Sequence, residues 1–211
     1  NIKPTFIKKN SLEYNYDNEI NFTGGNEFRD FNISSLRFFS KNIDTIYTTT
    51  NNIYSNPIYA VNLKQDQNRS NKPYFEKHDL NGKLIIQKDN SYSPENESEY
   101  VVVKFTLSQN GLHTDEKIYL FGGLSNWNIN PEFLLQHNPK TKSFEKEVLL
   151  KQGYYNYQYI TKKESEISTD LIEGNYYETN NEYTIYVYHK SPWERYERLV
   201  GVEKTTSNSL N

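Results

Sequence analysis

Hydrophobic and polar residues alternate over short segments along most of the chain, a pattern typical of half-buried β-strands. The plainest example is Tyr100 to Leu107, where Val101, Val103, Phe105 and Leu107 share one face and polar residues share the other. Such segments recur about every ten residues, and no long amphipathic helix interrupts them. The pattern predicts an all-β protein made of two consecutive β-sandwich domains.

The stretch from Lys117 to Ile160 organises the predicted second domain. It consists of a strand, a glycine pair, a polar loop with one tryptophan, a turn, and two further strands joined by a tight connection. These segments are, in order, 117–121, 122–123, 125–128, 138–142, 144–150 and 154–160. We therefore expect a strand, a Trp loop and a hairpin to form the framework of this domain.

The segment Asp89 to Ser98 has almost no apolar residues and contains a proline, as domain linkers do. It predicts a β-sandwich-like domain at 1–90, a linker at 91–98, an early-set-like sandwich at 99–202 and a flexible tail at 203–211. Within the first domain, Asn81-Gly82 separates two β-prone runs between Tyr74 and Ile86. Because both central residues of a type I′ turn need positive φ, this pair predicts a hairpin.

Composition narrows the possible functions. Aromatic residues make up 15% of the chain, with 19 Tyr and 11 Phe, which agrees with a β fold. The net charge is −3 and the charges are scattered, so nucleic acid is not an expected partner. There is no cysteine, and no apolar run is long enough to predict a membrane-spanning helix. The chain begins at Asn1 rather than Met, so we expect that upstream sequence, with any targeting segment, has been removed.

Two features could form a binding surface. Trp127 lies in a loop after a glycine pair, where its indole could stack on a sugar ring or pack back on its own domain. Tyr155, Tyr157 and Tyr159 share one face of the strand 154–160. This Tyr ladder could be a stacking platform, a protein interface or the inner wall of a sandwich. The sequence leaves these alternatives open.

No catalytic or metal-binding pattern emerges. The four histidines have no metal-ligand spacing, and acidic residues form no calcium-loop pattern. Glu145 and Glu147 share a strand face, but the alternation of Glu and Lys there predicts a solvated edge. No serine lies in a nucleophile elbow. We therefore expect a protein that is not an enzyme and that needs no cofactor or metal.

The stretch around Trp127 resembles the early-set β-sandwich of glycogen-binding and branching-enzyme accessory modules. The resemblance rests on the strand and small-residue turn 119–123, Asn126-Trp127, the turn 138–142 and the Gly-aromatic-x-aromatic strand 153–157. In the sugar-binding members a second Trp follows in the next loop, whereas 161–169 has no aromatic residue. The resemblance implies sandwiches of the immunoglobulin or early-set type. It also implies a carbohydrate-binding module, but one whose sugar site lacks the second Trp.

A wider resemblance covers nearly the whole chain. Five ordered blocks are similar to those of the type IX secretion system plug protein family, namely 24–37, 72–74 with 81–82, 149–159, 171–174 with 177–179, and 195–201. In that family an N-terminal β-domain and a signal peptide precede this region. The resemblance implies a non-catalytic periplasmic protein that docks beneath an outer-membrane translocon barrel and closes its pore between substrates.

Two other functions remain as alternatives. One is a carbohydrate-binding module that uses Trp127 and the Tyr ladder, with a glycan as partner. The other is an accessory domain of a glycan-processing enzyme whose catalytic part lies outside this sequence.

Overall fold

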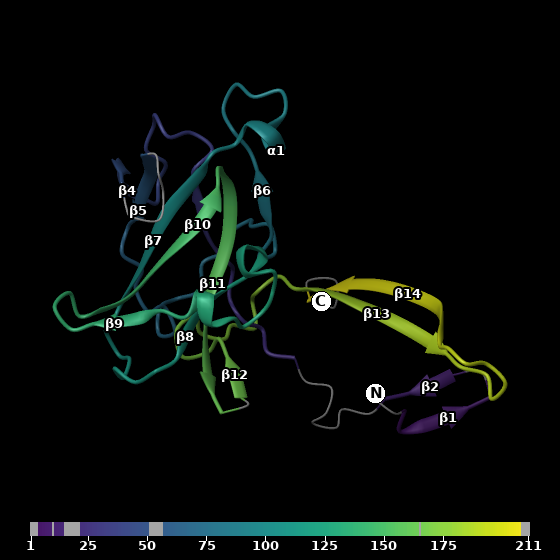
Figure 1. Cartoon of the computed structure of the whole chain (residues 1–211). Coiled ribbons are helices and arrows are strands. Elements are labelled where there is room, and N and C mark those ends of the chain that lie inside the picture. Colours follow the sequence, from purple (N-terminus) through teal and green to yellow (C-terminus); the bar gives the residue numbers. More distant parts are fainter. Residues whose placement is uncertain (1–3, 10, 15–21, 51–56, 165, 208–211) are drawn as a thin grey trace. The chain divides into compact units, whose positions relative to one another are not determined.

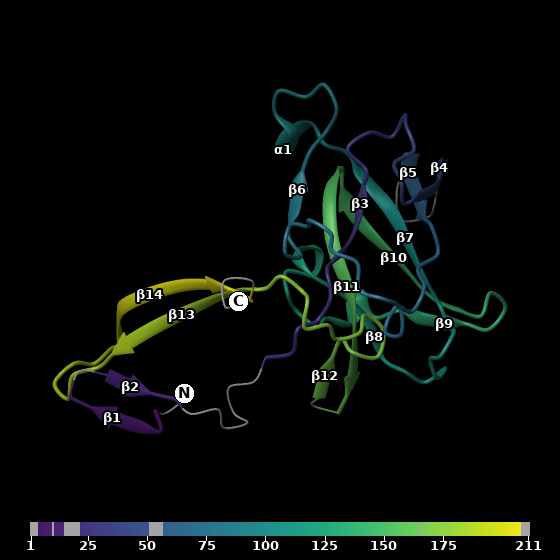
Figure 2. The same cartoon turned by 180° about the vertical axis from the view of Figure 1, so that it is seen from behind.

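The computed structural model describes residues 4–9, 11–14, 22–50, 57–164 and 166–207, and its elements are almost all strands (Figures 1 and 2). The strands are β1 (Phe6–Lys8), β2 (Ser11–Glu13), β3 (Arg29–Asn32), β4 (Ile43–Thr49), β5 (Ile58–Leu63), β6 (Leu84–Ile86), β7 (Tyr100–Ser108), β8 (Ile118–Phe121), β9 (Gln136–Asn138), β10 (Ser143–Lys151), β11 (Gly153–Lys163), β12 (Glu166–Ser168), β13 (Glu182–His189) and β14 (Arg198–Thr206). The helical turns are α1 (Pro94–Glu97), η2 (Gly123–Ser125) and η3 (Pro131–Phe133). No helix in the described ranges has the length and apolar content to cross a membrane.

The chain divides into two compact units. One combines 1–24 with 176–211, and the other is the continuous segment 25–175. This division differs from the predicted one, because the expected linker 91–98 lies inside the second unit and contains α1. Strands on both sides of that segment also pair directly: β5 pairs with β7, and β3 and β6 pair with β11.

The unit 25–175 contains two sheets. The first has the order β4-β5-β7-β10-β9, and all its pairs are antiparallel except β5 with β7. In the second, the long strand β11 pairs with β3, β6, β8 and β12. β10 and β11 are separated only by Gln152 yet belong to different sheets. The expected hairpin of the strands 144–150 and 154–160 is therefore wrong, because the tight connection at 151–153 carries the chain from one sheet to the other. β10 instead forms a hairpin with β9 across the predicted turn at 138–142.

One apolar core joins the two sheets. The predicted inner face of β7 is confirmed, because Val101, Val103, Phe105 and Leu107 are all fully buried. Phe105 meets Tyr157 of the other sheet with ring centroids 5.2 Å apart. Burying such large side chains from both sheets contributes about 1.5–3 kcal/mol for each residue. The mostly β class is thus confirmed, while the finer prediction of two consecutive sandwich domains is not.

The Asn81-Gly82 prediction is correct for the turn but wrong for the hairpin. Both residues have positive φ, 51° and 75°, and the N–H of Lys83 donates to the carbonyl of Leu80. However, the run before the turn is not a strand, and β6 after it pairs with β11. The side chain of Asn156 accepts a hydrogen bond from the N–H of Leu80, so the strand β11 holds this turn.

The unit made of 1–24 and 176–211 contains two separate two-stranded sheets, β1 with β2 and β13 with β14. The ring of Phe22 lies 5.5 Å from that of Tyr183, and the amide of Asn181 donates to the carbonyl of Gly24 at 2.7 Å. The predicted flexible tail begins too early, because 203–206 form the end of β14. The rest of that tail, 208–211, lies outside the described residues.

Candidate docking surface

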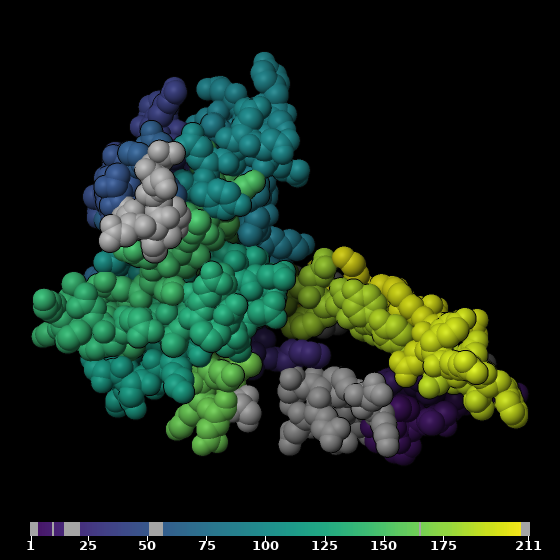
Figure 3. Space-filling model, viewed as in Figure 1, coloured from purple at the N-terminus to yellow at the C-terminus, as the bar shows by residue number. Residues whose placement is uncertain are grey.

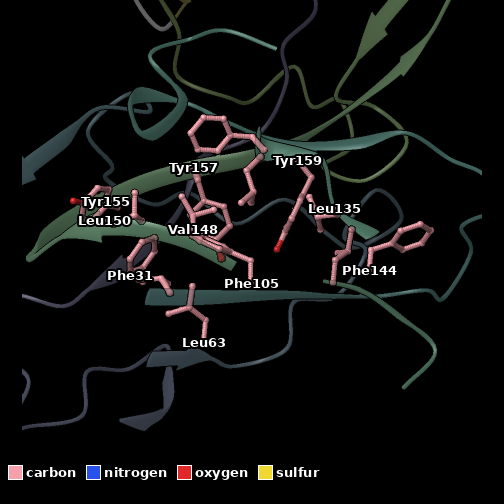
Figure 4. Close-up of a cluster of buried hydrophobic side chains, with 14 of the residues drawn as sticks. Phe31, Leu63, Phe105, Leu135, Phe144, Val148, Leu150, Tyr155, Tyr157 and Tyr159 are labelled. Atoms are coloured by element: carbon pink, nitrogen blue, oxygen red, sulfur yellow. The ribbon is translucent and has the colours of Figure 1, made fainter. Parts of the chain in front are cut away.

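The Tyr ladder is part of the inner wall of the core. Tyr155, Tyr157 and Tyr159 are 2%, 3% and 0% exposed, and Figure 4 shows them among the buried side chains between the sheets. The ring of Tyr155 stacks on Phe31 of β3 with centroids 5.1 Å apart and planes 4° apart. Of the three alternatives for the ladder, the structure therefore selects the inner wall, and its rings are closed to a ligand or partner.

Two hydroxyl groups of the ladder are held by the partly buried carboxylate of Asp66. Tyr157 and Tyr159 both donate to Oδ2 of Asp66, at 2.6 and 2.8 Å. Asp66 follows β5 and its other oxygen accepts from Nη1 of Arg29 at 2.8 Å. Burial raises the pKa of both tyrosines, and the neighbouring charge of Asp66 raises it further. The two tyrosines are thus neutral donors that tie β11 to the loop after β5.

Glu173 is the centre of the same network. Its side chain is 1% exposed, and its oxygens accept from Nε of Arg29 at 3.1 Å and from Nε of Arg69 at 2.5 Å. The N–H of Tyr159 also donates to it at 2.8 Å. Burial by itself would raise the pKa of Glu173, but the two guanidinium groups outweigh burial and hold it below its usual value. Glu173 is therefore an ionised carboxylate inside the fold.

The resulting ionic cluster consists of Arg29, Asp66, Arg69 and Glu173, two cations and two anions. Buried charges are stable only when they are paired and hydrogen-bonded, and each member here meets both conditions. The cluster joins β3, the loop after β5, β11 and the segment before 175. Its physical role is to fix these segments relative to one another, and it offers no free base or acid for catalysis.

The ionic cluster was not predicted from the sequence. Arg29 shares a face of β3 with the buried Phe31, and Glu173 lies between the buried Ile172 and Gly174. A charge on an otherwise apolar face was the available signal, but its partner lies 144 residues away along the chain.

The prediction that Glu145 lies on a solvated edge was also wrong. Its side chain is 16% exposed and accepts from Lys104 at 2.8 Å, and further hydrogen bonds come from Asn138, Thr141 and Ser143.

Trp127 is both packed and partly exposed. It follows η2 with φ 58°, and its N–H donates to the carbonyl of Gly122 at 3.0 Å. The rings of Phe28 and Phe121 meet it edge-on at 6.1 and 5.5 Å, and Gly82 leaves no space for a side chain beside it. The indole is nevertheless 44% exposed. The Trp127 loop therefore offers one ring to solvent, separated from the buried Tyr ladder.

An open depression of ≈ 720 Å³ lies beside the turn between β9 and β10. It is lined by Gln109, Asn110, Gly111, Leu112, His113, His137, Pro139 and Lys142. The Nε2 of His137 is 3.0 Å from Oε1 of Gln109. No carboxylate is present in this lining, so the depression lacks the acid and base pair of a hydrolase. Across the described residues, no group of three or more His, Cys, Asp or Glu side chains could hold a metal ion.

The ribbon formed by β13 and β14 exposes large apolar side chains on both of its faces. Tyr186 pairs with Val202 and Tyr188 pairs with Leu199 across the two strands, so all four lie on one face. Ile185 and Val187 lie on the other face. These six side chains are between 48% and 58% exposed, and Figure 3 shows the atoms of the ribbon, in yellow, at the surface.

The loop between the two strands adds two more aromatic rings to this ribbon surface. Trp193 is 93% exposed, and Tyr196 is also exposed. The loop has a defined conformation, because the N–H of Ser191 donates to Oε2 of Glu194 at 3.2 Å and Glu194 pairs with Arg198 at 3.0 Å. Exposed aromatic residues in a patch of this kind mark protein interaction sites.

The surface formed by β13 and β14 was not identified from the sequence. The signal was present, because both faces of this strand carry large apolar residues. A strand at the outside of a sandwich needs only one such face.

Comparison with known proteins gives a match among the solved structures. No family model matches the chain, and the search of curated proteins finds no significant match. The solved structures include a similar one, the crystal structure of a hypothetical protein from Parabacteroides merdae ATCC 43184. The two sequences are 36% identical and the structures superpose with a TM-score of 0.87. The match covers 96% of this chain and 50% of the Parabacteroides protein, so the chain spans about half the length of its relative.

Proposed function

We propose that the protein is a non-catalytic binding and gating module that works in the periplasm and plugs the outer-membrane translocon of the type IX secretion system. The observation that carries the proposal is the apolar ribbon of β13 and β14, with Trp193 and Tyr196 in its loop. Function by steric occlusion requires a docking surface of this kind and a rigid folded body that fills the pore. It requires no catalytic residues.

The ionic cluster supports the resemblance on which the proposal also depends. Arg29, Tyr159 and Glu173 belong to three different blocks of the plug-family resemblance, and all three contact one another in the core. Matches that meet in one buried network are the expected result when the resemblance reflects a shared folded unit. The early-set relationship of the segment around Trp127 is part of the same proposal.

The test is co-purification of the full-length protein with the outer-membrane translocon, combined with a leak assay for large antibiotics in cells. We expect the deletion strain to admit the antibiotics. The variant Trp193→Ala/Tyr196→Ala should fold normally, lose the translocon in the co-purification and fail to restore the barrier. Phe75→Ala is the matched control, because Phe75 is an exposed aromatic residue of the other unit, and it should behave like the wild type.

The two measurements can contradict the proposal separately. A protein that never co-purifies with the translocon, together with a deletion strain that stays impermeable, would remove the plug function. Retained binding by the Trp193→Ala/Tyr196→Ala variant would leave the plug function standing and exclude the ribbon loop as its contact.

Carbohydrate binding by Trp127 is a second candidate, favoured by the partly exposed and sterically fixed indole. The buried Tyr ladder cannot contribute, so a single ring would provide the stacking. Titration of glycan panels against the wild type and Trp127→Ala would decide the matter. Equal behaviour of the two proteins, or no binding by either, would eliminate this candidate.

A further inference from the structure

The two outer edges of the β13 and β14 ribbon differ in a way that indicates how a partner binds. A two-stranded ribbon has two edges with unpaired backbone groups, and in isolation it is only marginally stable in water. Within the described ranges, β13 and β14 pair only with each other. Over the described residues, neither outer edge of the ribbon is paired with a further strand.

The edge of β14 is protected against strand pairing. The register moves from Val187 opposite Gly201 to Tyr188 opposite Leu199, which leaves Val200 as an extra, bulged residue. A bulge bends the strand and interrupts its regular row of hydrogen-bonding groups. Charged residues at positions 198, 203 and 204 add a second barrier, since charges on an edge disfavour edge-to-edge association.

The central part of β13 has none of these features. From Tyr183 to Tyr188 the sequence is Tyr-Thr-Ile-Tyr-Val-Tyr, six residues without a charge, a proline or a glycine. All six are types enriched in strands, and uncharged segments of this length and composition readily pair with other strands. At about 3.4 Å for each residue the open edge is about 20 Å long. Its apolar side chains, Ile185 and Val187 on one face and Tyr186 on the other, are half-exposed.

We propose that β13 is a receiving edge, to which the protein partner adds an extended segment as a third strand of the ribbon. Backbone hydrogen bonds to the outer edge of β13 supply affinity, and apolar side chains at alternate positions of the added strand cover the two faces. The partner's segment is expected to be uncharged along its centre, because a charge there would lie beside the uncharged residues 183–188 of β13 without a counter-ion. The identity of the partner as the translocon rests on the proposed function, whereas the mode of binding rests on the ribbon alone.

Site-specific photo-cross-linking in cells that express the full-length protein tests both statements. A benzophenone side chain is placed at Ile185 or Tyr186 on β13, and at Val200 on the bulged strand as the control. We expect adducts with another protein from the two β13 positions and few from position 200. Adducts with the translocon support both proposals. Adducts with a different protein contradict the plug function, and the receiving edge then stands only if β13 is protected from hydrogen exchange in that complex. Adducts confined to a second copy or to the protein's own chain, or no adducts from β13, overturn the inference.

Hydrogen exchange then separates strand addition from contact through side chains alone. The measurement compares the free protein with its complex with the cross-linked partner, purified without cross-linking. The β13 amides that point away from β14 should exchange at least about ten-fold more slowly in the complex. Unchanged exchange of these amides would overturn strand addition even where the cross-links form.

Charge substitutions provide the matched variants. Ile185→Lys/Val187→Lys places two charges on the receiving strand and should weaken the complex by about ten-fold or more, since charged residues block edge pairing. Val200→Lys adds a charge at an equally exposed apolar position on β14 and should leave the affinity within about two-fold. Equal loss in both variants would contradict the assignment of β13 as the receiving edge.

Discussion

Two tyrosine-rich strands of this protein have similar local sequences and opposite environments. β11 reads Tyr-Tyr-Asn-Tyr-Gln-Tyr-Ile from 154 to 160, and β13 reads Tyr-Thr-Ile-Tyr-Val-Tyr-His from 183 to 189. β11 pairs with four strands and its ladder of tyrosines is buried, whereas β13 pairs with one strand and Tyr186 and Tyr188 are exposed. The difference lies in how many neighbours each strand has, which no local pattern encodes.

Tyrosine suits both environments because it combines a large apolar ring with a polar tip. In β11 each tip of the ladder has a buried acceptor: Asp66 for Tyr157 and Tyr159, and the carbonyl of Lys151 for Tyr155 at 2.6 Å. On the ribbon the rings are open to a partner. Substitutions in the buried network should therefore change stability, and substitutions on the ribbon should change binding.

The largest expected effect comes from Glu173→Gln. It removes the charge that balances Arg29 and Arg69, and breaking a buried ion pair costs about 3–5 kcal/mol. For a protein of this size we expect the thermal unfolding midpoint to fall by about 10 °C or more. Glu178→Gln, at an exposed position nearby in the chain, is the control and should change stability by less than about 0.5 kcal/mol. Equal midpoints for the two variants would show that the cluster is not a stabilising element.

The second effect is Gly82→Ala. Gly82 has φ +75°, and a methyl group there would overlap Cη2 of Trp127 and lie 2.6 Å from Cε1 of Phe28. Positive φ and overpacking together should cost about 2–4 kcal/mol. Gly111→Ala isolates the backbone contribution, because its φ is +77° but its nearest neighbour is 3.8 Å away. Chemical denaturation gives both free energies, and Trp127 fluorescence in a Trp193→Phe background should shift only for Gly82→Ala.

The third prediction compares the two strands directly. Tyr157→Phe removes a buried donor to Asp66 and should destabilise the protein by about 1–2 kcal/mol. Tyr188→Phe removes a hydroxyl from the exposed ribbon and should stay within about 0.5 kcal/mol of the wild type. Urea unfolding of the two variants is sufficient for this test. A larger loss from Tyr188→Phe than from Tyr157→Phe would mean that the contrast between the strands is misjudged.

The smallest effect concerns pH. Burial alone would raise the pKa of Glu145, but Lys104, Thr141, Ser143 and Asn138 together lower it from 4.5 to about 2. Because the folded pKa is the lower one, Glu145 contributes its full stability above pH 4.5 and loses it as the pH falls toward 2. Glu145→Gln keeps an acceptor oxygen and should cost about 1 kcal/mol at pH 7. Unfolding midpoints of the wild type and of Glu145→Gln, measured from pH 7 to pH 2.5, should converge as the pH falls. A constant difference across this range would exclude ionisation of Glu145 as the cause.

Much of the local structure followed from the sequence. Alternation predicted the buried face of β7 and the strand at 144–150. Turn chemistry predicted the positive φ of Asn81 and Gly82. The predicted linker failed because a polar segment with a proline has the same composition whether it separates domains or, as at α1, caps the end of a sheet. The hairpin at 74–86 was wrong because the residues before the turn form no strand, and β6 pairs instead with β11, a strand far along the chain.

The amino-acid sequence by itself determined the β class, the faces of the strands and the positions of the turns, because these depend on interactions between residues close together in the chain. Only the tertiary structure decided that Tyr155, Tyr157 and Tyr159 are buried, that Arg29 meets Glu173, and that β13 and β14 form a ribbon with exposed faces. Each of these depends on which distant segments become neighbours. Burial and charge pairing are properties of that arrangement, so two tyrosine-rich strands came to serve as a core wall and as a surface.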